Sequence, residues 1–180
     1  MKIVISPEFQ KEAEDYAMSS RAYTSNRHDF HEGGLSAKQR KMFEGKLGEK
    51  AVKQLFLANN ILFEEDKTSF DEEDFFDFLV WVDKTGQELK VDVKTRTKDF
   101  HTRTLEMVEQ MKKKPKDIYI SVRLFDKIPY EVELIGFGFK QDFLLKNPIE
   151  NQGYLDNYVL YDKDLHPIIN MLDKLRKNEK

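Results

Sequence analysis

The stretch "FFDFLVWVDKTGQELKVDVKTRT", residues 75–97, decides the expected fold because it reads as two strands joined by a turn. An apolar run and an alternating run predict strands over about 75–82 and 88–95, and the intervening "DKTGQ" offers Gly86 for the turn. The first strand carries a lone carboxylate, Asp77, among apolar residues. Because an unpaired buried carboxylate is costly, Asp77 is expected to have a proton, a cationic partner or a metal ion.

The second strand places a carboxylate and a lysine side by side. Since strand side chains alternate between faces, Asp92 and Lys94 share one face, roughly 6.5–7 Å apart, and Val91 and Val93 share the other. If the two strands pair as a hairpin, Asp77 lies close to Asp92. Two carboxylates held together raise each other's pKa unless a cation intervenes. Lys94 supplies part of that charge, and a hard divalent cation such as Mg²⁺ can supply more.

The pattern acid-x-Lys is weak by itself, because it occurs four times in the chain, beginning at Glu44, Glu65, Glu88 and Asp92. The occurrence at Asp92 differs in its context, since it follows an apolar strand with its own Asp. Phosphodiester hydrolysis needs this set of groups: a metal neutralises charge on the phosphate and lowers the pKa of a bound water. The strand offers Asp92, the Val93 carbonyl and a lysine that can orient that water, take its proton or stabilise developing charge.

A helix precedes the two strands. Apolar residues at three- and four-residue spacing predict it over about 36–59, and it contains "GKLGEK", residues 45–50. Gly45 and Gly48 each cost about 1 kcal/mol relative to Ala in a helix, so we expect this helix to pack closely against the sheet. Glu49 borders the apolar face and can point at the strand carboxylates. The alternative is a surface glutamate paired with neighbouring lysines.

Taken together, Gly48-Glu49 on a helix, Asp77 on a strand and Asp92-x-Lys94 on the next strand resemble the PD-(D/E)XK nuclease superfamily. The resemblance implies an α/β fold with a restriction-endonuclease-like core, in which a mixed central sheet is flanked by helices. It also implies that Asp77 and Asp92 bind Mg²⁺, with Mn²⁺ able to substitute. In addition, it implies that Glu49 assists the metal site and that Lys94 serves the attacking water.

The resemblance covers about residues 38–140, and we expect one domain over 1–180, with an added N-terminal helix and loop and a C-terminal strand and helix. Phe76 stands where the family has its proline. The remaining pattern predicts helices over about 6–19 and 103–114, strands near 117–125, 130–140 and 154–162, and a loop at "NPIENQG". In the last helix an apolar stripe is expected to form core or dimer contacts, and it comprises Leu165, Ile168, Ile169, Leu172 and Leu175.

Charge and composition are consistent with a polyanion as partner. The chain has no cysteine and a net charge of −3, so disulfides and thiolate metal sites are excluded. Residues 84–116 hold ten Lys or Arg against five acids, and residues 64–77 hold eight carboxylates. No apolar run approaches the roughly 18 residues of a membrane span, so we expect no membrane contact and a cytoplasmic protein.

Residues directly after the lysine are candidates for phosphate contacts, although each could equally lie in a solvated loop. Such contacts need only cations and hydroxyl groups near a phosphate backbone. The candidates are Thr95, Arg96, Thr97, Lys98, His101 and Arg103. His28, His31 and Glu32 could bind a transition metal, but no distant third ligand accompanies them.

These observations predict a Mg²⁺-dependent DNA endonuclease that hydrolyses phosphodiester bonds, such as a type II restriction enzyme. Cutting both strands with one active site per chain calls for a homodimer. The alternatives are a catalytically silent nucleic-acid-binding module of the same fold, and a nuclease acting on branched DNA or RNA.

Overall fold

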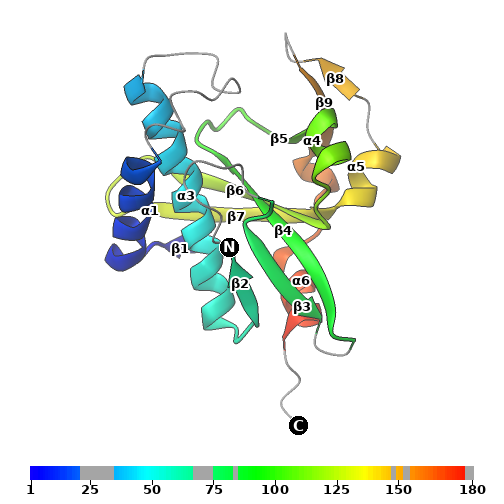
Figure 1. Cartoon of the computed structure of the whole chain (residues 1–180), viewed down its shortest axis with the longest axis horizontal. Helices are drawn as coiled ribbons and strands as arrows, with labels where there is room; N and C mark the ends of the chain where they lie inside the picture. Colours follow the sequence, from blue (N-terminus) through cyan, green and yellow to red (C-terminus); the bar gives the residue numbers. More distant parts are fainter. Residues whose placement is uncertain (21–34, 67–74, 83–84, 147–148, 152–154, 177–180) are drawn as a thin grey trace.

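The computed structural model describes residues 1–20, 35–66, 75–82, 85–146, 149–151 and 155–176. It is a mixed α/β fold in which a curled mixed sheet is flanked by helices (Figure 1). The strands are β1 (Lys2–Val4), β2 (Phe63–Glu65), β3 (Phe78–Val82), β4 (Gln87–Arg96), β5 (Arg103–Met107), β6 (Ile118–Phe125), β7 (Glu131–Phe139), β8 (Ile149–Asn151) and β9 (Asp156–Tyr161). The helices are α1 (Pro7–Ser19), α3 (Leu35–Ala58), α4 (Val108–Lys113), α5 (Lys140–Lys146), α6 (Ile168–Leu175) and the short 3-10 helix η1 (Asp162–Asp164).

The main sheet has the strand order β1-β7-β6-β4-β3-β2. Strands β3 and β4 pair antiparallel, with Phe78 opposite Val91, which confirms the predicted pairing. Gly86 in the turn before β4 has φ +64°, a left-handed conformation that glycine adopts without strain. On its other edge β4 runs parallel to β6, the strand whose sequence "IYISVRLF" is almost unbroken in its apolar character. Such a sequence is typical of a strand that is covered on both faces.

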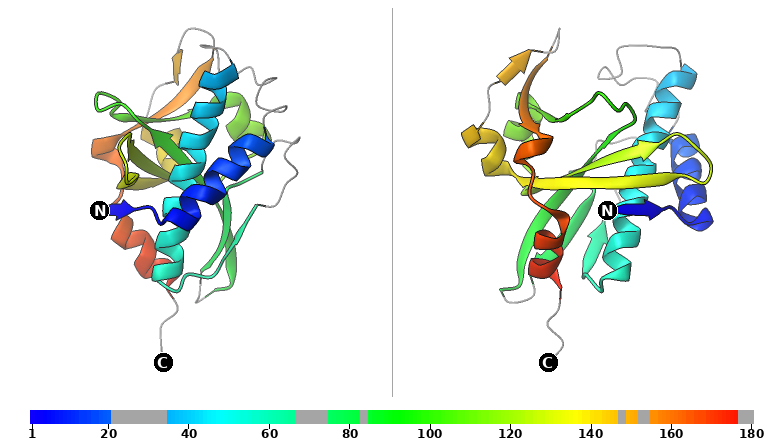
Figure 2. Two further views of the ribbon diagram at one scale, coloured as in Figure 1. Left: turned by 90° about the vertical axis from the view of Figure 1, so that its left-hand side faces the viewer. Right: turned by 180° about the vertical axis from the view of Figure 1, so that it is seen from behind.

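Neighbouring residues of β6 belong to two different apolar clusters. Ile118 and Ile120 lie in the main core with residues of α1, α3 and α6, whereas Tyr119 packs with Phe143 of α5 and Leu160 of β9. Because successive side chains of a strand point to opposite faces, the sheet is covered on both sides. In Figure 1, α1 and α3 lie together on the left and α5, β8 and β9 on the right, and Figure 2 shows α6 from behind.

Helix α3 crosses the sheet closely at one of its two glycines. A Cβ on Gly48 would lie 2.0 Å from Thr95 Oγ1 and 3.0 Å from Val122 Cγ2, so the sheet leaves no room for a side chain there. This confirms the expectation of close packing for Gly48. The same expectation is wrong for Gly45, where a Cβ would meet nothing within 4 Å. In the described part of the chain, no helix is both long enough and apolar enough to span a membrane.

A second, three-stranded sheet has the order β5-β9-β8, and it corrects two predictions. The helix expected over 103–114 is wrong in its first half, because Arg103–Met107 is strand β5 and only Val108–Lys113 is helical. Leu, Glu and Met favour helices, but pairing with β9 decides the conformation here. The loop expected at "NPIENQG" is also wrong at Ile149–Asn151, which forms β8.

The apolar stripe of the last helix belongs to the core. Ile168, Leu172 and Leu175 are buried in the main cluster, and Leu165, which precedes the helix, packs against the second cluster. Ile169 is 44% exposed. The interpretation of the stripe as core is therefore confirmed, and as a dimer surface it offers no more than Ile169.

Candidate active site

Asp77 directly precedes β3, in a bend, so the strand expected to begin near residue 75 begins only at Phe78 and does not include Asp77. The register that pairs Phe78 with Val91 brings Asp77 next to Asp92. The amide of Asp77 donates to the Val91 carbonyl oxygen at 2.9 Å, and its carboxylate Oδ2 accepts a hydrogen bond from the Val93 amide at 2.6 Å. The side chain thus takes the place of a backbone acceptor in the ladder, which fixes this carboxylate against β4.

Lys94 bridges two carboxylates that come from different sheets. Its Nζ lies 2.8 Å from Asp92 Oδ2 and 2.7 Å from Glu106 Oε2. Glu106 belongs to β5, and its side chain is fully buried. Another lysine, Lys116, is buried and places its Nζ 3.8 Å from Asp92 Oδ1. Asp92 therefore lies between two ammonium groups, and Lys94 lies between two carboxylates.

Glu49 approaches the same site from α3. Its carboxylate lies 2.7 Å from Lys46 Nζ, and both side chains are largely buried. Glu49 is also close enough to Asp77 for its charge to raise the pKa of Asp77. Pairing with a neighbouring lysine and pointing at the strand carboxylates were alternatives in the sequence, and the structure combines them.

The charges of this cluster do not balance. Among the residues that the structure describes, four carboxyl groups face three ammonium groups, namely Glu49, Asp77, Asp92 and Glu106 against Lys46, Lys94 and Lys116. The excess negative charge falls on Asp77, because burial, Glu49 and Asp92 together raise its pKa well above the ordinary value. Burial acts on Asp92 in the same direction, but Lys94 and Lys116 hold the pKa of Asp92 below its ordinary value.

Lys94 stays positively charged in this setting. Burial alone would lower the pKa of Lys94, but Asp92 and Glu106 outweigh it and raise that pKa above the ordinary lysine value. For Glu106, burial is the largest influence and raises the pKa of this carboxyl, while Lys94 opposes the rise. An ammonium group with a raised pKa is a poor proton acceptor, so Lys94 is suited to orienting a water or stabilising negative charge.

A groove of about 520 Å³ opens beside this cluster, along the end of β4. β3 pairs with β4 only as far as Val91, and no other described strand continues on that edge of β4. The groove is bordered by α3 through Gly45 and Glu49, by β4 from Val93 to Arg96 with Thr97 directly after it, and by β5. Glu49, Val93 and Lys94 line it, whereas Asp77 and Asp92 lie behind its wall.

Five of the six candidates for phosphate contact line the same groove, and Lys98 is exposed outside it; the five are Thr95, Arg96, Thr97, His101 and Arg103. Two of the cations already have carboxylate partners within the chain. Arg96 donates to both carboxylate oxygens of Asp162, at 2.8 and 2.6 Å, and Arg103 pairs with Glu150. Their charge is therefore partly neutralised.

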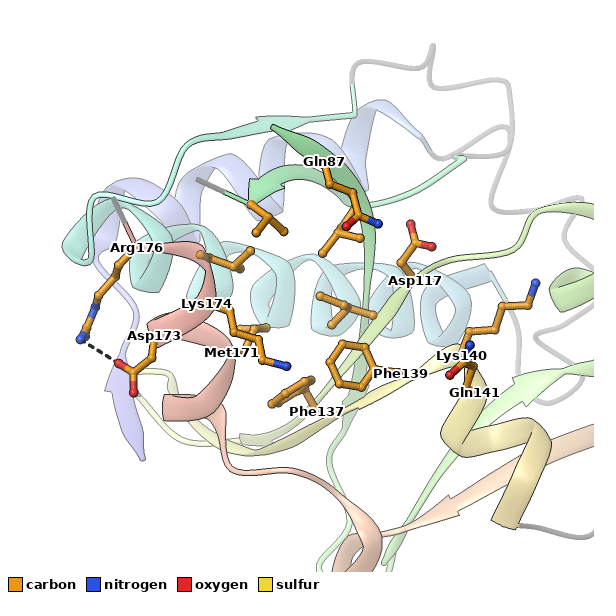
Figure 3. Close-up of a pocket in the computed structure, with 14 residues that line it drawn as sticks. Gln87, Asp117, Phe137, Phe139, Lys140, Gln141, Met171, Asp173, Lys174 and Arg176 are labelled. Carbon is orange, nitrogen blue, oxygen red and sulfur yellow. Dashed lines mark hydrogen bonds and ion pairs between the residues drawn. The ribbon is translucent and has the colours of Figure 1, made fainter. Parts of the chain in front are cut away.

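Another cavity, of about 580 Å³, lies elsewhere in the fold, between α6 and strands β4 and β7 (Figure 3). Phe137 and Phe139 form part of its wall, with Lys174 above the ring of Phe139. None of the sequence-predicted site residues lines it. The residues predicted from the chemistry gather at the first groove.

The donor set suits a hard divalent cation held by few protein ligands. Over the described ranges, no three His, Asp or Glu side chains stand close enough to hold a metal ion together. Asp77 and Asp92, however, face each other with an excess of negative charge, and Mg²⁺ binds through one or two carboxylates plus water and phosphate oxygens. Those two carboxylates fit such an ion. His28, His31 and Glu32 lie outside the described residues.

Sequence reasoning missed two charged residues of this cluster, Glu106 and Lys116. Glu106 fell within the helix expected over 103–114, and Lys116 fell between that helix and the strand expected near 117–125. The available signal was the strand-like alternation of polar Thr104 and Glu106 with apolar Leu105 and Met107. In the structure the two polar residues are buried and the two apolar ones are not.

No protein-family model, curated protein or solved structure matches the chain.

Proposed function

We propose that the chain is a Mg²⁺-dependent endodeoxyribonuclease with a restriction-endonuclease-like core, with Mn²⁺ able to replace Mg²⁺. One observation carries the proposal. Two partly buried carboxylates, Asp77 beside the end of the Phe78–Val91 register and Asp92 on β4, carry more negative charge than the lysines described around them neutralise, and Lys94 follows Asp92 two residues later on the same strand. A divalent cation would supply the missing charge.

Each residue has a role in this proposal. Asp77 and Asp92 would hold the ion, which supplies charge neutralisation at the phosphate and a water of lowered pKa. The ammonium group of Lys94 orients the attacking water or stabilises the charge that develops on the phosphate. Glu49 borders the groove and would assist the metal site.

DNA would lie in the groove beside β4. Thr95, Thr97 and His101 line it and offer hydroxyl and imidazole groups for phosphate contacts. Cleavage of both strands calls for two active sites, so we propose a homodimer on DNA.

Incubation with supercoiled plasmid and linear duplex tests the proposal, in Mg²⁺, Mn²⁺ or EDTA, with Asp92→Asn in parallel. We expect metal-dependent cleavage that the variant lacks, and discrete fragments would make the protein a sequence-specific restriction enzyme. Cleavage that persists in EDTA, or equally in Asp92→Asn, would refute the roles given to the metal and to Asp92. Branched DNA and RNA substrates test the alternative nucleases.

A catalytically silent binding module of the same fold is the second candidate. It is favoured by the internal neutralisation of Asp92, which has lysines on both sides, and by the absence of a three-ligand cluster in the described ranges. This module would bind nucleic acid with strong salt dependence, and neither Mg²⁺ nor Asp92→Asn would change its affinity.

A further inference from the structure

Phe100 is an aromatic side chain presented to solvent at the mouth of the groove. Among the aromatic residues that the structure describes, Phe75 and Phe100 are exposed, by 53% and 77%. The ring of Phe100 lies 4.6 Å from that of His101, at 81°, so the two rings do not stack on each other. His101 itself lines the groove. Phe100 therefore stands at the rim, with most of its apolar surface in water.

The loop that carries Phe100 is anchored at both ends by one residue. Before the loop, Arg96 donates two hydrogen bonds to the Asp162 carboxylate, and after it the Thr102 carbonyl oxygen accepts from the Asp162 amide at 3.0 Å. Within the loop, the His101 amide donates to the Lys98 carbonyl oxygen at 3.2 Å and closes a turn. A ring held in this way can contact a ligand at a small cost in conformational entropy.

The groove beside this ring presents cationic side chains at its surface. Its lining holds four Lys or Arg against two Glu, which are Lys41, Lys94, Arg96 and Arg103 against Glu44 and Glu49, although Lys94, Arg96 and Arg103 also pair with carboxylates outside the lining. Aromatic rings beside basic grooves bind nucleic acid by stacking on bases, and this stacking is tolerant of sequence.

We propose that Phe100 stacks on an unpaired base of DNA lying in this groove. The inference rests on the proposed nuclease function and favours, within it, the structure-specific alternative, whose substrate is duplex DNA with a locally unpaired nucleotide, as at a flap, gap or mismatch. The reason is energetic. Bases inside an intact duplex are already stacked, and opening a step costs a few kcal/mol, whereas an unpaired base is available to the ring.

A thermodynamic cycle tests the stacking contact without any cleavage. Dissociation constants are measured in EDTA by fluorescence anisotropy for the wild type and Phe100→Ala. The DNA is a duplex carrying one unpaired thymidine, or the same duplex with an abasic nucleotide in its place. Because base stacking on an aromatic ring is worth about 5- to 150-fold in affinity, we expect the wild type to lose that factor on the abasic DNA and Phe100→Ala to lose almost nothing.

Two variants serve as controls. Ile128→Ala removes an apolar side chain that is 85% exposed and does not line the groove, so both DNAs should bind it as they bind the wild type. Phe100→Trp keeps a stacking ring and should retain the preference for the unpaired thymidine. Since Phe100 is exposed, neither of its substitutions should change the thermal midpoint by more than a degree or two.

The outcomes separate this inference from the proposed function. The stacking role would be overturned if Phe100→Ala weakened binding equally on both DNAs or on neither of them. It would also be overturned if the wild type bound neither DNA. The coupling between Phe100 and the unpaired base is the preference for the unpaired thymidine that Phe100→Ala removes. If this coupling appeared only when the unpaired strand is RNA, the choice of DNA would be overturned. Metal-dependent plasmid cleavage without coupling would leave the nuclease proposal intact and refute the role of Phe100. Coupling without any cleavage would support the role of Phe100 in a binding module.

Discussion

Replacing Asp77 by Asn should stabilise the fold at a pH above the raised pKa of Asp77 and abolish the stabilisation by Mg²⁺ that the proposed metal site implies. The asparagine amide oxygen can still accept the hydrogen bond from the Val93 amide that Asp77 accepts at 2.6 Å, so the ladder contact is kept. What disappears is a buried negative charge beside Asp92 and Glu49.

The size of the stabilisation expected for Asp77→Asn follows from the strand register. Extending the β3–β4 register by one residue sets Asp77 opposite Asp92, and facing residues of an antiparallel pair have Cβ atoms about 4.5–5.5 Å apart, so we expect the two charges at roughly 6 Å. At an effective dielectric constant of about 20, their repulsion is about 3 kcal/mol, and Lys46 offsets part of it. We therefore expect Asp77→Asn to raise the free energy of unfolding by about 1–3 kcal/mol. For a chain of this size, the thermal midpoint should rise by about 2–10 °C.

The pH dependence has a defined sign. The pKa of Asp77 is raised in the folded state above its ordinary value of 3.8, so the folded chain binds this proton more tightly than the unfolded chain. The wild type then has its full stability below pH 3.8 and loses stability as the pH rises through the raised pKa. The advantage of the variant should vanish in acid and be complete above that pKa.

Thermal unfolding by circular dichroism, with and without Mg²⁺ or Mn²⁺, measures both effects. A metal ion at 100 times its dissociation constant stabilises the wild type by about 2.7 kcal/mol, and Asp77→Asn should lose this shift. Asp117→Asn is the matched control, because Asp117 accepts a hydrogen bond from the Lys90 amide at 2.8 Å but is exposed. A less stable Asp77→Asn at a pH above the raised pKa of Asp77, or a metal shift equal to that of the wild type, would refute this reasoning.

Three further predictions concern packing and charge. Gly48→Ala should destabilise the fold by about 1–3 kcal/mol, because its Cβ would meet Thr95 Oγ1 at 2.0 Å, whereas Gly45→Ala, with open space, should stabilise it by about 1 kcal/mol in urea unfolding. Lys94→Met should cost about 3–5 kcal/mol, since it leaves buried Asp92 and Glu106 without their shared cation; unchanged stability would contradict that pairing. Glu106→Gln should lower the turnover number of metal-dependent cleavage more than it changes KM, as steady-state kinetics would show, and Glu106→Asp should recover part of the loss.

The hairpin and the first half of the candidate site could be predicted because their signals are local. Alternation places Asp92 and Lys94 on one face of β4, and the turn at Gly86 sets the pairing that brings Asp77 to Asp92. The glycine at position 48 indicated close packing of α3, and the structure shows Thr95 in the way of any side chain there.

The second sheet could not be predicted, because its strands depend on partners that are distant in the sequence. Arg103–Met107 contains good helix formers, and it becomes a strand only by pairing with Asp156–Tyr161. Glu106 reaches Lys94 through that pairing, so its place in the site depended on a contact that local propensity cannot show.

The charge of Asp77 distinguishes a structural from a functional explanation of the site. The ladder at Val93 needs only a hydrogen-bond acceptor, and a neutral Asn or Ser would provide one without repelling Asp92. A carboxylate at this position adds burial and repulsion to the same hydrogen bond, so it lowers the stability of the metal-free fold. Proteins retain such costly groups mainly at functional sites, and a divalent cation is the ligand that turns the repulsion of two facing carboxylates into attraction. Glu49 and Lys94 line the groove that is open along β4 beside this pair, so a cation bound by the two carboxylates would stand close to a phosphodiester lying in the proposed DNA groove.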